Sequence, residues 1–170
     1  MARVSTQKAR KDYPDQGIVK GDTYYKWTLR PGGRYSKGVL YRSARLPRPS
    51  QLTSNAFRSS LYSLQEQVDD LTTENAHTDR EGIVEEIRAL GEDQREKFDN
   101  MPEGLQQGDT GQLLEGRADA CGEWADELEG IDLSELEQDY RPEDHDSEEA
   151  WEELKQEKVD ELQGIEYNGD

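Results

Sequence analysis

The chain has 170 residues, of which 31% are hydrophobic and 35% are charged, and its formal net charge is −18. So little hydrophobic sequence with so much net charge argues against one large core and favours thin helical assemblies or disordered segments. The charge is unevenly divided. Residues 1–50 carry 12 Lys or Arg and 3 Asp or Glu, whereas residues 51–170 carry 9 and 36. A basic head on an acidic body predicts two segments with different partners, or one segment that binds the other.

Cysteine content and hydropathy indicate the compartment. Cys121 is the one cysteine, so the chain can form no internal disulfide and no thiolate zinc site, which fits a reducing compartment. The first residues, MARVSTQKARK, lack the apolar core of a signal peptide. No run approaches the roughly 18 apolar residues of a spanning helix. We therefore expect a cytoplasmic protein that has no membrane partner.

Residues 1–50 predict a basic, aromatic β segment with a mobile arm over residues 1–12. A turn follows at Pro14–Gly17, because Pro fixes φ and Gly permits positive φ. The strand signals are 18–20, the β-branched and aromatic run 23–29, and 34–41 after the turn Arg-Pro-Gly-Gly. They predict a β-hairpin or a three-stranded meander.

Alternation along the run 23–29 assigns its two faces. Tyr25, Trp27 and Leu29 fall on one face, which we expect to be the core side. Tyr24 and its alternate neighbours fall on the other face, which we expect to be open. A lone hairpin is marginal in water, so this one is expected to pack on a following helix.

Residues 51–130 predict a helical bundle or coiled-coil-like segment with helices at 53–74, 79–100 and 110–129. Apolar residues in the first and third helices follow a 4-3-4-3 spacing, which is typical of heptads. Gly91 weakens the second helix by about 1 kcal/mol relative to Ala. The seams could pair within the chain or between chains, and both arrangements remain open. The predicted assembly seam consists of Phe57, Leu61, Leu64, Val68, Leu71, Leu114, Cys121 and Leu128.

Residues 131–170 predict an acidic tail with one short helix at 147–163. Ser147 is the expected N-cap, with two Glu in the first turn. Gly130 and Gly164 each precede an Ile and predict left-handed helix stops. Together the segments predict an α+β fold.

Three stretches support a resemblance to known proteins. GIVKGDTYYKW, RPSQLT and NMPEGLQQGDTGQLL resemble a group of uncharacterised bacteriophage proteins described as hypothetical or coil-containing. The resemblance spans most of residues 8–130. It implies a phage-encoded protein in the host cell cytoplasm, with a basic β segment followed by helices. It carries no known catalytic residues.

The basic head combines cations with aromatic rings. Lys and Arg bind phosphates, and unpaired bases stack on exposed rings. Alternatively, the rings form a core and the cations pair with the acidic helices. The acidic body could mimic the phosphates of DNA or be a solvated surface. The candidate residues for binding nucleic acid or another partner are Arg10, Lys11, Lys20, Lys26, Arg30, Arg34, Lys37, Arg42, Tyr24 and Tyr35.

The sequence offers no convergent catalytic set. The only histidines are His77 and His145, and no EF-hand spacing accompanies them. The glycines of residues 104–111 are not followed by the Lys-Ser/Thr of a P-loop. Cys121 lies on the helical seam and is expected to be a small buried hydrophobe. We therefore expect no catalytic residue, no metal and no cofactor.

The leading hypothesis is a non-enzymatic interaction protein that engages a host or phage macromolecule through its basic head. It would have a protein partner or associate with itself. The alternative is a nucleic-acid-binding module that binds through residues 8–48 and is autoinhibited by its acidic C-terminal region.

Overall fold

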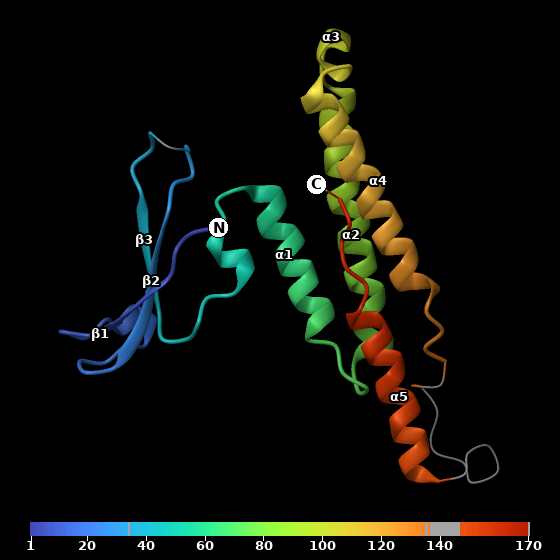
Figure 1. Cartoon of the computed structure of the whole chain (residues 1–170), viewed down its shortest axis with the longest axis horizontal. Coiled ribbons are helices and arrows are strands. Elements are labelled where there is room, and N and C mark those ends of the chain that lie inside the picture. Colours follow the sequence, from blue (N-terminus) through green and yellow to red (C-terminus); the bar gives the residue numbers. More distant parts are fainter. Residues whose placement is uncertain (34, 135, 137–146, 170) are drawn as a thin grey trace. The chain divides into compact units, whose positions relative to one another are not determined.

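The computed structural model describes every residue except 34, 135, 137–146 and 170. A small antiparallel sheet precedes a series of helices (Figure 1), which confirms the predicted α+β fold. The chain divides into two compact units, residues 1–63 and residues 64–170. We call them the basic unit and the helical unit. The division falls within α1 (Ala56–Asp69).

The basic unit is built on three antiparallel strands, β1 (Ser5–Lys8), β2 (Thr23–Leu29) and β3 (Val39–Ser43), with β2 in the centre (Figure 1). Two short 3-10 turns lie in its loops, η1 (Pro14–Gln16) and η2 (Pro49–Leu52). The β-branched and aromatic run thus forms the central strand, as its composition predicts.

Three predictions for the basic unit are wrong. Residues 5–8 are not a mobile arm, because they form β1 along the edge of β2. Ile18 belongs to no strand and instead forms an isolated bridge with Tyr13. The third strand begins at Val39 rather than at residue 34. The turns at residues 17 and 33 are confirmed, since Gly17 (φ 64°) and Gly33 (φ 78°) adopt the positive φ that glycine tolerates.

The sheet buries aromatic residues on both faces. Trp27 is buried as predicted; its Nε1 donates to the Gln51 carbonyl at 2.9 Å, and its ring stacks on Tyr41 at 5.7 Å between centroids. Tyr24 is also buried, which contradicts the prediction of an open face. The chain between β1 and β2 folds back over that face and packs Ile18 on Tyr24. Alternation assigns residues to faces but does not reveal that a loop covers the second face.

The helical unit is organised around an antiparallel pair, α2 (Ala76–Asp99) and α4 (Asp109–Gly130), joined through the single turn of α3 (Glu103–Gln106) (Figure 1). Ion pairs between the two helices show that the pairing is antiparallel. Arg88 of α2 contacts Asp126 of α4 at 2.9 Å. Arg95 lies seven residues after Arg88 and contacts Asp119, which lies seven residues before Asp126, at 2.5 Å. No helix was predicted for Glu103–Gln106.

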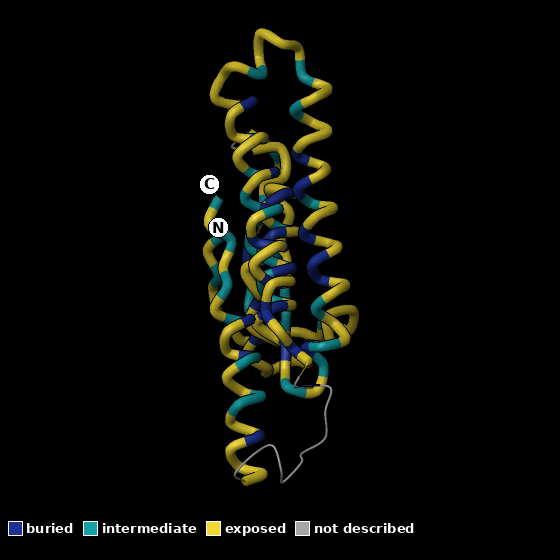
Figure 2. Tube along the Cα trace, turned by 90° about the vertical axis from the view of Figure 1, so that its right-hand side faces the viewer, coloured by how far each residue is buried: buried dark blue, intermediate teal, exposed yellow. Residues whose placement is uncertain are grey.

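The core of the helical unit runs along the facing sides of the long helices (Figure 2). Ile87 on α2 and Ala125 on α4 are fully buried. The two main chains approach closely at Gly91, where an added Cβ would lie 2.9 Å from the Cys121 Cβ and 3.2 Å from the Ala118 carbonyl oxygen. The glycine that weakens α2 locally therefore permits its packing on α4.

The last helix, α5 (Glu148–Gln163), matches its predicted bounds closely. Ser147 caps it as predicted, since its hydroxyl accepts from the Ala150 amide at 3.1 Å. The Gln163 side chain donates to the carbonyls of Asp69 and Leu71 at 2.9 and 2.8 Å. The C-terminal end of α5 is thereby joined to the chain that leaves α1.

Several helix ends differ from the prediction. α1 begins after Asn55 rather than at 53, because the Asn55 side chain accepts from the Arg58 amide at 2.9 Å. Gly130 is the last residue of α4 and is followed by extended Ile131, so the predicted left-handed stop is wrong. Gly164 also keeps right-handed dihedrals. Across the described helices, no stretch combines the length and hydropathy needed to cross a bilayer.

Candidate binding surface of the basic unit

The basic unit carries 13 Lys or Arg against 3 Asp or Glu. Among the described residues, the salt bridges that join two residues of the same unit all lie in the helical unit. Arg10, Lys20, Lys26, Arg30 and Lys37 accordingly form no ion pair with a described carboxylate of the basic unit. Cations without an ion-pair partner attract counterions, which a polyanionic partner would displace.

The structure sorts the predicted binding residues by exposure. Tyr35 is 95% exposed, so its ring is available for contact. Tyr24 is only 5% exposed, so the prediction that it contacts a partner is wrong. Arg34 lies outside the described residues. The exposed cations are Arg10, Lys11, Lys20, Arg30 and Lys37, and the half-buried ones are Lys26 and Arg42.

Arg42 and Lys11 form cation–π contacts with the ring of Tyr13. The Arg42 guanidinium lies 4.8 Å from the centre of the Tyr13 ring, and the Lys11 ammonium lies 5.5 Å from it. Tyr13 packs in turn on Tyr24, at 5.8 Å between ring centroids. Arg42 also faces Lys26 directly across β2 and β3, a like-charge pairing that disfavours the sheet. The Tyr13 ring compensates for this repulsion through its cation–π contact.

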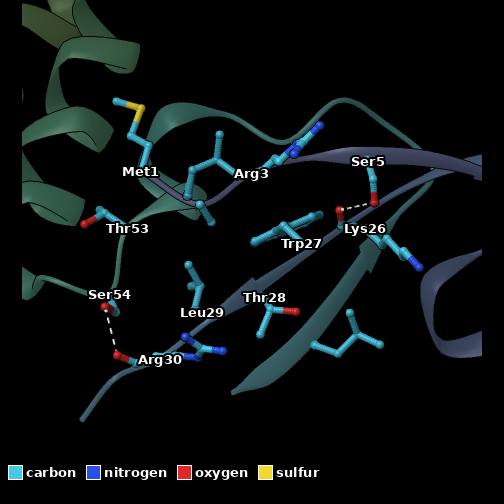
Figure 3. Close-up of a pocket in the computed structure, with 13 residues that line it drawn as sticks. Met1, Arg3, Ser5, Lys26, Trp27, Thr28, Leu29, Arg30, Thr53 and Ser54 are labelled. Carbon is cyan, nitrogen blue, oxygen red and sulfur yellow. Dashed lines mark hydrogen bonds between the residues drawn. The ribbon is translucent and has the colours of Figure 1, made fainter. Parts of the chain in front are cut away.

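A hollow of about 440 Å³ lies beside β2, and we call it the edge hollow (Figure 3). Trp27, Thr28 and Leu29 of β2 line one side of it. Arg3, Lys26 and Arg30 contribute cations, and none of its 13 lining residues is acidic. The first residues of the chain complete the wall, because the Ala2 amide donates to the Leu52 carbonyl at 2.6 Å.

The edge hollow was not predicted from the sequence. Arg3 and Met1 lie in the segment that was expected to be mobile, so no motif placed them beside Trp27. The available signal was compositional, since no acidic residue precedes Asp12. A second hollow of about 630 Å³ adjoins Tyr13 and Tyr24 and likewise includes cations, Lys8 and Arg10, and no carboxylate.

The predicted assembly seam lies inside the chain. Its residues are buried except Leu114, which is half-buried. Burial raises the pKa of the Cys121 thiol to about 11, partly opposed by the charge of Arg117. A thiol with so high a pKa holds little thiolate at neutral pH and is a poor nucleophile.

The described residues can recognise a partner through charged side chains and through main-chain hydrogen-bonding groups. No three His, Cys, Asp or Glu side chains converge as metal ligands among them. His145, one of the two histidines, lies outside the described residues together with its neighbours Asp144 and Asp146. No protein family, curated protein or solved structure matches this chain.

Proposed function

We propose that this chain is a non-enzymatic, phage-encoded interaction protein whose basic unit binds an anionic host or phage macromolecule. The observation that carries the proposal is the set of exposed cations without ion pairs inside the basic unit. Such charges accelerate association and supply salt-dependent affinity for a polyanion. The phage origin rests on the sequence resemblance alone.

The helical unit acts in this proposal as a support rather than as the contact surface. Its apolar seam is already buried within the chain, so little of it is left for a second copy. Its surface carries a large excess of Asp and Glu, which repels an anionic partner. The partner is thereby directed to the basic unit.

Nucleic acid is a second candidate partner. Tyr35 is 95% exposed and Tyr41 is 40% exposed, and both lie in the cation-rich segment between β2 and the end of β3. Exposed rings among cations are the elements that bind single strands by base stacking and phosphate contact. Under this alternative the acidic residues of the helical unit compete for the same cations.

The test is a titration of the full chain with three labelled polyanions across a salt series: polyglutamate, single-stranded DNA and duplex DNA. We expect at least one to bind, with an affinity that falls log-linearly with salt concentration. Lys20→Ala with Lys37→Ala should weaken binding. The matched control, Arg95→Ala with Lys97→Ala in the helical unit, removes the same charge and should not. No binding to any polyanion at low salt would contradict the proposal.

Competition by the acidic surface is tested by substitution rather than by deletion, because α5 contributes Trp151 and Leu162 to the core. Glu149→Gln, Glu153→Gln and Glu157→Gln neutralise exposed positions of α5. Higher affinity for DNA would support the autoinhibited alternative. Unchanged affinity would count against it.

A further inference from the structure

The edge of β2 is only partly covered. β1 pairs with β2 from Lys8↔Thr23 to Ser5↔Lys26. Beyond Ser5 the chain leaves the sheet, since the Ala2 amide donates to the Leu52 carbonyl instead of to β2. β2 continues to Leu29 with β3 on one side and the edge hollow on the other.

The register identifies the main-chain groups that face the edge hollow. The Ala9 amide donates to the Asp22 carbonyl at 2.8 Å, just outside β1 and β2. In an antiparallel pair every second residue points its N–H and C=O to the same side. Asp22, Tyr24 and Lys26 therefore point toward β1, and so does Thr28. The Thr28 N–H and C=O have no main-chain partner among the described residues.

The side chains around Thr28 define what could pair with it. Arg3, Lys26 and Arg30 are basic, and no lining residue is acidic. The apolar lining is largely aliphatic and includes Leu29 and Leu40. Trp27 is only 5% exposed and is already stacked on Tyr41, so it has no free face for a base. A nucleotide would also set its phosphate against the Thr28 carbonyl.

An extended peptide satisfies these groups together. Its main chain would pair with both the N–H and the C=O of Thr28, as in strand addition to a sheet edge. Its carboxylates would meet the cations, and its alternate apolar side chains would meet the aliphatic lining. We propose that the edge hollow binds an extended acidic segment of a protein partner, which adds a short strand to β2 in line with β1.

The inference rests on the proposed function, because it names the partner class of the same basic unit. The probe is a labelled peptide of alternating Glu and Val, titrated into the full chain. We expect it to bind and to slow amide hydrogen exchange at Thr28. The same peptide with every main-chain nitrogen methylated keeps its charge but loses its donors, and should bind about tenfold more weakly. A Lys-Val peptide should not bind.

Two double variants distinguish binding at the edge hollow from general attraction to the positive charge of the basic unit. Arg3→Ala with Arg30→Ala removes two cations of the edge hollow, and Lys20→Ala with Lys37→Ala removes two cations outside it. Both pairs change the net charge equally. We expect the first to weaken binding of the Glu-Val peptide about tenfold or more, since charged hydrogen bonds are lost, and the second to weaken it about twofold. Unchanged thermal midpoints would show that both variants fold.

The outcomes distinguish failure of the edge-hollow inference from failure of the proposed function. Equal binding of the methylated peptide, equal weakening by both variant pairs, or unaltered exchange at Thr28 would overturn the edge-hollow inference. Binding of DNA without binding of the Glu-Val peptide would overturn it too, while leaving the proposed function intact. Failure of every polyanion to bind would overturn both proposals.

Discussion

Gly91→Ala should fail to stabilise the protein, although Ala favours a helix by about 1 kcal/mol over Gly. The new Cβ would lie 2.9 Å from the Cys121 Cβ and 3.2 Å from the Ala118 carbonyl oxygen. Both atoms are fixed to the main chain of α4, so neither can rotate away. Overpacking of this kind costs about 1–3 kcal/mol. The net change in the free energy of unfolding should be a loss of about 0–2 kcal/mol.

Gly82→Ala is the matched control in the same helix. No atom lies within 4 Å of its added Cβ, so only the helix propensity acts and the variant should gain about 1 kcal/mol. Chemical denaturation followed by far-ultraviolet circular dichroism measures both variants. The two should differ by about 1–3 kcal/mol. Equal stabilisation by both substitutions would refute the close approach of α2 and α4.

Three further predictions concern the helical unit. Ile87→Ala should lower the free energy of unfolding by about 2–5 kcal/mol, because a fully buried side chain leaves a cavity; a loss below about 1 kcal/mol would contradict the core. Ser147→Ala should cost about 1 kcal/mol while Ser147→Asp keeps the cap, and equal midpoints for the two would refute the capping contact. Cys121 should react with an aromatic disulfide only as fast as the protein opens. Its pKa, raised from 9.0 to about 11, cuts the thiolate fraction about a hundredfold at neutral pH, and rapid labelling of the folded chain would contradict its burial.

The helices were predictable because their signals are local. The heptad-like spacing of apolar residues predicted α1 and α4, and the hydroxyl of Ser147 marked the start of α5. The central strand was equally clear from its β-branched and aromatic residues. These features depend on neighbours within one or two turns of the chain, so the order of residues in the sequence is enough to identify them.

The missed features depend on contacts between distant residues. Ser5–Lys8 is polar and exposed, so nothing in its own composition distinguishes β1 from a mobile arm. Tyr24 is buried because the loop before β2 folds back over it. Gly91 resembles a weak point until Cys121 is seen against it. The edge hollow is lined by the first residues of the chain, by β2 and β3, and by the chain at the end of η2, and no local pattern joins these segments.

Amide hydrogen exchange of the full chain, with and without a saturating anionic polymer, tests the central claim most directly. The polymer is whichever of polyglutamate or DNA binds in the salt series. Binding by the basic unit predicts slower exchange within residues 1–63 and unchanged exchange within residues 64–170. Slower exchange confined to residues 64–170 would contradict the assignment of binding to the basic unit.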